Sequence, residues 1–219
     1  MAQAGEELEP SELGTLEYWE STYKTELKNF SDHGDIGEIW FGEDSEMRII
    51  RWLSQNEVIK SDDPIIDLGC GNGMMLVEMA REGYTNLTGV DYSQKAVDLA
   101  RAVIDAQDIK CIKLESCDIL SNDFPTKEYT VVHDKGTYDA VSLCPDNAAD
   151  KRKKYISNIL KILKPNGFFI ITSCNWTTEE LISHFNEDFE VSHRIPAPVF
   201  NFGGKTGSLV SSVVFKKKI

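Results

Sequence analysis

Short apolar runs alternate with longer amphipathic stretches along the middle of this chain. The runs, which are typical of buried strands, lie at Ile65–Leu68, before Asp91, from Ile109, at Tyr129–Val132 and in FFIIT from Phe168. The intervening stretches keep apolar residues at helical spacing over residues 74–80, 93–107 and 150–163. Strands that alternate with helices predict an α/β fold with a doubly wound, Rossmann-like, mostly parallel sheet.

Both ends of the chain add further elements. A helical pattern begins at Leu16, with Thr15 as its expected N-cap, and continues to Phe30. The remaining elements are a helix over residues 45–55, a short helix capped by Thr177 and Glu180, and two β-rich stretches over residues 189–196 and 208–215. The last two stretches predict an antiparallel C-terminal hairpin at the edge of a sheet of seven strands.

We expect a single domain over residues 14–219, preceded by a disordered acidic tail. A chain of 219 residues is long enough to bury one substantial core. Residues 1–13 are acidic and lack aromatic side chains, which is the composition of a disordered segment.

A glycine-rich turn joins the strand at Ile65 to the helix that follows it. Gly69, Gly71 and Gly73 recur at every second position, and Asp67 precedes them. Glycine has no Cβ and tolerates positive φ, so a ligand can lie against the backbone near the helix N-terminus. A dinucleotide-binding turn reads G-x-G-x-x-G and seats a pyrophosphate, which the Asp67 carboxylate would repel. The turn predicts a nucleotide-like ligand with a cationic amino group; a tight loop without a ligand is the alternative.

Acidic residues follow the other strands at the edge where open parallel sheets bind ligands. Asp91 ends the second strand, roughly 20 residues after the glycine turn, where it suits ribose hydroxyls. Asp118 follows the third strand and suits an exocyclic adenine amine. Asp134 follows the fourth strand and is either a functional acid, a helix cap or the partner of Lys135. The neighbouring His133 fits a structural histidine better than a base.

The net charge and the cysteines indicate which partners and which cellular compartment to expect. A net charge of −13 disfavours binding to nucleic acid and favours a basic protein substrate, unless it only keeps the protein soluble. The five cysteines form no C-x-x-C pair and no histidine cluster accompanies them, so we expect reduced core residues and no metal site. The sequence shows neither a basic leader nor a long apolar run. We expect a cytoplasmic location, with the nucleus also open to the protein, and no membrane partner.

The glycine turn, Asp91 and Asp118 together resemble the first three motifs of the class I, seven-stranded methyltransferases that use S-adenosylmethionine. Three further segments, GEIWFG, DKGTYDA and ITSCNW, resemble the lysine methyltransferases of translation elongation factor 1-alpha, and the likeness covers Leu13–Phe215. That resemblance implies a seven-stranded fold, S-adenosylmethionine as the donor, and methyl transfer to a lysine ε-amine of the elongation factor. The fourth strand lacks N-P-P-Y or D-P-P-Y, so mechanisms of nucleic-acid or glutamine methylation are not carried over.

The resemblance also implies roles for individual residues. It places Asp134 beside the transferred methyl group, and Asn175, after the fifth strand, is the second candidate catalytic residue. Trp40, Phe41 and Trp176 are the candidates for a lysine channel, and the N-terminal helix is expected to cover the cofactor. The candidate cofactor-binding residues are Trp19, Asp67, Gly69, Gly71, Asn72, Gly73, Asp91, Tyr92, Asp118, Ile119 and Asp134.

Other functions fit some of the same motifs. A small-molecule methyltransferase would keep the cofactor, and a non-catalytic scaffold would bind it on behalf of another protein. The acidic charge disfavours RNA methylation, and the glycine spacing disfavours an NAD enzyme. We expect the protein to act as a monomer.

Overall fold

A seven-stranded sheet forms the centre of the computed structural model, which describes residues 7–124, 126–202 and 205–218. The strand order is β3-β2-β1-β4-β5-β9-β6. The strands are β1 (Ile65–Leu68), β2 (Leu87–Asp91), β3 (Ile112–Ser116), β4 (Tyr129–Lys135), β5 (Leu163–Ser173), β6 (Phe189–Ile195) and β9 (Ser211–Lys217). Strands β1 to β5 are parallel, and β9 lies antiparallel between β5 and β6. The expected sheet and its antiparallel C-terminal edge are confirmed.

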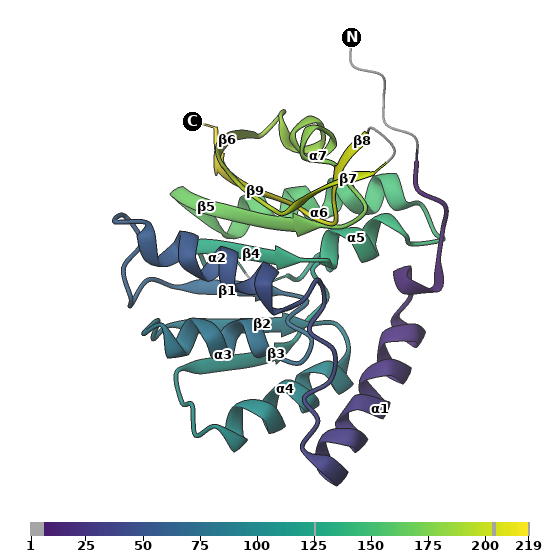
Figure 1. Ribbon diagram of the computed structural model, residues 1–219, viewed down its shortest axis with the longest axis vertical. Helices are drawn as coiled ribbons and strands as arrows, with labels where there is room; N and C mark the ends of the chain where they lie inside the picture. The colour runs from purple at the N-terminus through teal and green to yellow at the C-terminus, as the bar shows by residue number, and fades with distance from the viewer. Residues whose placement is uncertain (1–6, 125, 203–204, 219) are drawn as a thin grey trace.

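Helices cover both faces of the sheet and the edge at which the parallel strands end (Figure 1). They are the short 3-10 helix η1 (Glu12–Gly14), α1 (Leu16–His33), α2 (Glu43–Gln55), α3 (Met74–Arg81), α4 (Gln94–Ala106), α5 (Thr137–Ser142), α6 (Ala148–Ile162) and α7 (Thr178–Phe185). Figure 1 shows the N-terminal segment and α1 running along that edge. In the described parts of the chain, none of the helices combines the length and the apolar character that crossing a bilayer requires.

Side-chain caps fix where three of the helices begin. Thr15 accepts a hydrogen bond from the first turn of α1, and Ser93 does the same for α4. Thr177 and Glu180 form the reciprocal capping box expected from the sequence at the start of α7. These contacts satisfy N–H groups that have no partner within the helix. The helices predicted after Thr15 and Ser93 are therefore confirmed.

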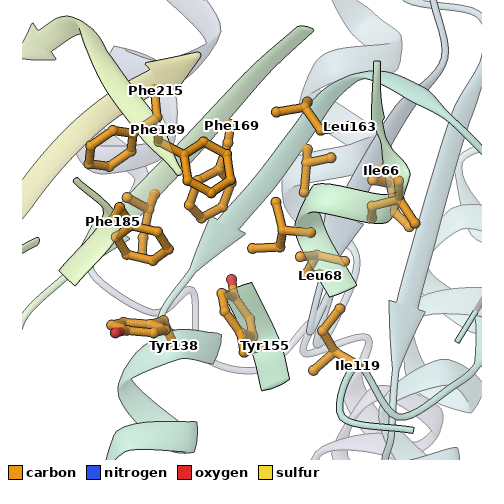
Figure 2. Close-up of a cluster of buried hydrophobic side chains, with 14 of the residues drawn as sticks. Ile66, Leu68, Ile119, Tyr138, Tyr155, Leu163, Phe169, Phe185, Phe189 and Phe215 are labelled. Atoms are coloured by element: carbon orange, nitrogen blue, oxygen red, sulfur yellow. The ribbon is translucent and has the colours of Figure 1, made fainter. Parts of the chain in front are cut away.

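Apolar side chains from both faces of the sheet form the core. One cluster joins the sheet to α5, α6 and α7, and Figure 2 shows its aromatic members Phe169, Phe185, Phe189 and Phe215 gathered together. A second cluster packs α2 and α3 against the opposite face, and a third joins α1 to α3 and α4. This packing holds the strand ends and the flanking helices in fixed positions, which a binding site at the strand ends requires.

Strand β4 extends further than its apolar run predicts. It continues past Val132 through His133 and Asp134 to Lys135. His133 and Asp134 pair with β1 on one side and with β5 on the other, so backbone pairing continues although the side chains have become polar. His133 and Asp134 are consequently buried inside the sheet rather than exposed at its end.

Three smaller differences concern other elements. β3 begins at Ile112 rather than at Ile109, and β5 begins at Leu163, before the residues expected to separate it from α6. The loop expected between the last two strands contains a separate hairpin of β7 (Val199–Phe202) and β8 (Lys205–Ser208).

The N-terminal segment contacts the fold from residue 7 onward. Glu7 Oε1 lies 2.6 Å from a guanidinium nitrogen of Arg152, and Leu8 packs against the aromatic core cluster. The backbone N–H of Ser11 donates to the carbonyl of Leu143 at 3.0 Å. The predicted disordered tail is wrong for residues 7–13, because an ion pair and an apolar contact hold them; residues 1–6 lie outside the described part of the chain.

Candidate active site

A cavity of about 860 Å³ opens at the edge where the parallel strands end. Residues that follow β1, β2, β3, β4 and β5 form one side of it. Leu13 and Trp19 from the N-terminal segment, with Trp40 and Phe41 from the loop before α2, line the other side. Small-molecule sites typically measure about 300–1,000 Å³, so this cavity is at the large end of that range.

The glycine turn brings bare backbone to the wall of the cavity. Gly69 and Gly71 line it and have φ values of 66° and 52°, in the left-handed region that favours glycine. A Cβ on Gly69 would lie 2.0 Å from Thr137 Oγ1, and one on Gly71 would lie 2.6 Å from the Tyr23 hydroxyl oxygen. Both positions therefore require glycine for backbone conformation and for space.

Asp91 holds the glycine turn and faces the same cavity. One carboxylate oxygen accepts a hydrogen bond from the N–H of Gly71 at 3.1 Å, and the other accepts from the N–H of Ser93 at 2.9 Å. Burial raises the pKa of Asp91 to about 6, although these two hydrogen bonds oppose the shift. Each oxygen retains room for a further donor, which is the arrangement that a pair of ribose hydroxyls needs.

Three further cofactor candidates form the neighbouring part of the wall. Tyr92, Asp118 and Ile119 line the cavity beyond the ends of β2 and β3. Asp118 accepts a hydrogen bond from the N–H of Leu120 at 2.8 Å, which fixes the bend in the chain there. The structure therefore brings these residues together with Asp91 and the glycine turn.

Asn72 also lines the cavity and braces the glycine turn against the loop after α1. Its side-chain amide donates to the carbonyl of Ile36 at 3.0 Å and to that of Glu38 at 3.2 Å. Its amide oxygen accepts from the N–H of Met74 at 3.2 Å, at the start of α3. The side chain thus joins three segments that surround the cavity.

Two other members of the glycine motif lie behind the cavity wall. Asp67 is buried and its carboxylate lies 2.7 Å from Nδ1 of His133, so strand pairing has turned it toward the neighbouring strand. Gly73 faces α4, where a Cβ would lie 3.0 Å from the Ala100 Cβ. Neither residue is among those that line the cavity, and Gly73 serves the packing of α3 against α4.

Asp134 is a helix cap, which was the alternative to a functional acid. Its carboxylate accepts hydrogen bonds from the N–H groups of Thr137 at 3.1 Å and Tyr138 at 3.0 Å, at the start of α5. It also accepts a hydrogen bond from the hydroxyl of Tyr155. The side chain is fully buried and does not line the cavity, and burial raises its pKa to about 8.

The aromatic loop before α2 reaches the cavity as the sequence suggested. The ring centroids of Trp19 and Trp40 lie 5.1 Å apart, and a Cβ on Gly136 would lie 3.2 Å from the Phe41 ring. The ammonium of Lys135 donates to the carbonyl of Trp40 at 2.9 Å, which ties this loop to the end of β4. Trp40 and Phe41 therefore form a fixed apolar wall.

Asn175 and Trp176 are adjacent in sequence but lie in different surroundings. Asn175 lines the cavity. Trp176 is buried in the aromatic core cluster, where its indole N–H donates to Ser142 Oγ at 3.2 Å and its ring faces Arg152. Trp176 does not line the cavity, so the proposed role for it in a lysine channel is not supported by its position.

The structure adds Thr137 and Asp139 to the residues considered from the sequence. Both line the cavity from α5, and Thr137 Oγ1 donates to the carbonyl of Leu68 at 2.7 Å, directly before the glycine turn. Asp139 belongs to the segment DKGTYDA that carried part of the resemblance. A helix beginning after Gly136 would have directed attention to it, but the apolar pattern did not reveal that helix.

Comparisons with known proteins agree with this geometry. A family model described as a methyltransferase domain matches residues 59–214. The chain is 47% identical over 208 residues to human EEF1A lysine methyltransferase 2, across 95% of this chain and 88% of the human one. It is 37% identical over 227 residues to the protein-lysine N-methyltransferase EFM4 of Saccharomyces cerevisiae, across 99% of both.

Solved structures with the same fold include further methyltransferases. The N-methyltransferase NodS of Bradyrhizobium japonicum, in complex with S-adenosyl-L-homocysteine, matches with a TM-score of 0.66 and 15% identity, over 91% of this chain and 98% of that one. A S-adenosylmethionine-dependent methyltransferase of Clostridium acetobutylicum matches with a TM-score of 0.63, over 89% and 98% of the two chains. At such low identity the likeness shows the fold.

Proposed function

We propose that this chain, which belongs to the methyltransferase family and to its branch of elongation factor 1-alpha lysine methyltransferases, methylates a lysine of that factor. The observation that carries the proposal is the 47% identity to human EEF1A lysine methyltransferase 2 across 95% of this chain. The enzyme is a S-adenosylmethionine-dependent protein-lysine methyltransferase.

The donor set at the glycine turn fits S-adenosylmethionine. Gly69 and Gly71 present bare backbone to the cavity, and Asp91 offers a buried carboxylate beside it. We assign the ribose hydroxyls to Asp91, the adenine edge to Asp118 and Ile119, and the methionine end to the backbone of the turn. Trp19 and Tyr92 would cover the bound cofactor from the opposite wall and the end of β2. Asp67 would act through His133 and the turn, because its carboxylate lies behind the wall.

When bound, S-adenosylmethionine would supply a methyl group attached to a sulfonium. The amine nitrogen of the substrate would form a bond to the methyl carbon while the carbon–sulfur bond breaks, and the electron pair of that bond would stay on sulfur. The target lysine must first release a proton to water, which costs about 4.6 kcal/mol at pH 7 for a pKa of about 10.4. Apolar walls such as Trp40 and Phe41 lower that cost, because burial disfavours the charged amine. Fixing the amine in place removes a further part of the barrier.

The domain boundaries, the assembly state and the compartment follow from the same proposal. We assign residues 14–219 to one methyltransferase domain, in which α1 covers the cofactor, and we place the protein in the cytoplasm, with access to the nucleus, as a monomer. The position of α1 beside Gly71, through Tyr23, supports its covering role. The net charge of −13 supports a protein partner over direct contact with nucleic acid.

Incubation of the purified protein with labelled S-adenosylmethionine and an extract of cells lacking it tests the substrate class. We expect label on a lysine of elongation factor 1-alpha, identified by mass spectrometry of the labelled band. Label on small molecules or RNA would assign another substrate, and cofactor binding without any labelled product would indicate a scaffold.

A further inference from the structure

The acid that the family resemblance places beside the methyl group is closed to an incoming amine. Asp134 is fully buried, and three hydrogen bonds from Thr137, Tyr138 and Tyr155 occupy its carboxylate. Removing it from this environment would leave the first turn of α5 without its cap. A carboxylate that meets the target amine is therefore one of those that line the cavity, and Asp139 is one of these.

Asp139 lines the cavity from α5 and is held rigidly by the end of β5. One carboxylate oxygen accepts a hydrogen bond from Ser173 Oγ at 2.5 Å, and the other accepts from the N–H of Cys174 at 2.8 Å. The Cys174 thiol and the N–H of Asn175 also interact with this carboxylate. Asp139 differs from Asp134 in that it lines the cavity, so a donor inside the cavity can approach it. Burial raises the pKa of Asp139, which is a cost that a cation bound beside it would offset.

Residues next to Asp139 on α5 contact both the glycine turn and the apolar wall formed by Trp40 and Phe41. Thr137, two positions earlier on α5, contacts both the carbonyl of Leu68 and the space beside Gly69. Gly136, directly before α5, lies under the ring of Phe41. A carboxylate, an apolar wall and the glycine turn therefore surround the acceptor end of one cavity. This combination suits a primary amine at the end of an aliphatic chain, because the wall accepts the methylene groups and the carboxylate accepts the amine.

We propose that Asp139 receives the ε-amine of the target lysine and orients it, while Trp40 and Phe41 hold its aliphatic stem. This inference rests on the proposed function of the protein as a lysine methyltransferase. The Asp139 carboxylate first binds the lysine in its ammonium form. After one proton has left to water, the carboxylate accepts a hydrogen bond from the neutral amine. This hydrogen bond keeps the lone pair of the amine nitrogen directed into the cavity. The same negative charge favours the protonated amine, so Asp139 aids capture and orientation rather than deprotonation.

The test compares Asp139→Asn with the wild-type protein, using purified unmethylated elongation factor 1-alpha as substrate. Asn keeps the size of the side chain and can still accept the hydrogen bond from Cys174. Asp105→Asn is the matched control, because Asp105 is exposed on α4 and does not line the cavity. We expect kcat to fall by about 100-fold, the loss typical of a misplaced reacting group, with S-adenosylmethionine affinity within about twofold of wild type.

Two further readouts separate orientation of the amine from a structural role. The affinity of the S-adenosylhomocysteine-loaded protein for the elongation factor should fall by about tenfold, because a charge-assisted hydrogen bond is lost. The pH at which the rate reaches half its maximum should shift downward in Asp139→Asn, because removing an anion lowers the pKa of the bound lysine. A structural role would change neither the substrate affinity nor the pH profile specifically.

Each outcome decides the inference. The inference is overturned if kcat of Asp139→Asn stays within about twofold of the wild-type value. It is also overturned if the variant loses cofactor affinity and substrate affinity equally. If Asp139→Asn does not fold, Asp139→Glu decides: retained substrate affinity with a lower kcat supports the inference, and unchanged kcat overturns it. Wild-type protein that does not methylate the elongation factor at all would contradict the proposed function instead.

Discussion

The part of the cavity formed after β1, β2 and β3 takes its functional groups directly from the strand ends. The part formed after β4 and β5 takes only Asn175 from a strand end, and its other groups come from α5 and from a distant loop. We call these the cofactor half, with Gly69, Gly71, Asp91 and Asp118, and the acceptor half, with Trp40, Phe41, Asp139 and Asn175. A strand that ends promptly presents its next residue to the ligand. A strand that continues, as β4 does, buries the residue that sequence position would assign to the site.

The largest expected effect in the cofactor half follows removal of the Asp91 carboxylate. Asp91→Ala should weaken S-adenosylmethionine binding by about 100-fold, or about 2.7 kcal/mol, because charge-assisted hydrogen bonds to ribose and the bond to Gly71 are lost together. Calorimetric titration measures this. Asp105→Ala, on the exposed face of α4, is the control and should bind normally; equal affinity in the two variants would remove Asp91 from the cofactor half.

Asp134 provides the corresponding test for the buried end of β4. Near pH 6, Asp134→Asn should lower the free energy of unfolding by about 2 kcal/mol. The amide nitrogen of Asn cannot accept a hydrogen bond, whereas both carboxyl oxygens of Asp134 accept them, from Thr137, Tyr138 and Tyr155. Denaturant titration measures the change. Unchanged stability would show that the cap contributes little to α5.

The difference in free energy of unfolding between wild type and Asp134→Asn should depend on pH in a defined direction. Burial raises the pKa of Asp134 to about 8 in the folded protein, compared with about 3.9 in an unfolded chain. The folded state therefore binds this proton more tightly, and its contribution to stability falls as the pH rises from about 4 through about 8. Because Asn does not titrate, the advantage of wild type over Asp134→Asn should shrink between about pH 6 and pH 8. A difference that grows with pH would contradict this assignment.

A smaller effect separates backbone strain from occupied space at the glycine turn. Gly71→Ala places a Cβ 2.6 Å from the Tyr23 hydroxyl oxygen at a φ of 52°, whereas Gly34→Ala meets nothing within 4 Å at a φ of 73°. Both variants carry the cost of a left-handed backbone. Only Gly71→Ala should weaken cofactor binding, by about tenfold, since only it lies on the cavity wall. Equal affinities of Gly71→Ala and Gly34→Ala for S-adenosylmethionine in calorimetry would mean that Gly71 does not contact the cofactor.

The smallest expected effect is the pH dependence of cofactor binding. Since the pKa of Asp91 is about 6, lowering the pH from about 7 to about 5 protonates the carboxylate that accepts the ribose hydroxyls. Affinity should fall several-fold over that range in wild type and stay flat in Asp91→Ala. A wild-type affinity independent of pH would place the ribose elsewhere.

The cofactor half could be predicted from the sequence because its geometry is local. A strand, a turn of glycines and a helix fix the positions of Gly69 and Gly71, and the end of β2 fixes Asp91. Even there, spacing alone did not show that Gly73 packs against α4, since that depends on a helix more than 20 residues away.

The acceptor half could not be predicted to the same extent because pairing between distant strands decides it. The end of β4 depends on registers with β1 and β5, which bury Asp134 although its sequence is polar. Trp176 is held in the core by Ser142 of α5, which accepts its indole N–H, and by Arg152 of α6, which faces its ring. The ion pair of Glu7 likewise depends on Arg152, a partner that composition does not reveal.

Single-turnover methylation of purified elongation factor 1-alpha at increasing S-adenosylmethionine concentration tests the division of the cavity most directly. One titration gives both the cofactor concentration at half-saturation and the maximal rate. We predict that Asp91→Ala raises the half-saturating concentration and largely keeps the maximal rate, whereas Asp139→Asn lowers the maximal rate and keeps the half-saturating concentration. Parallel changes of both quantities in both variants would contradict the account, because the two halves would then act as one binding site.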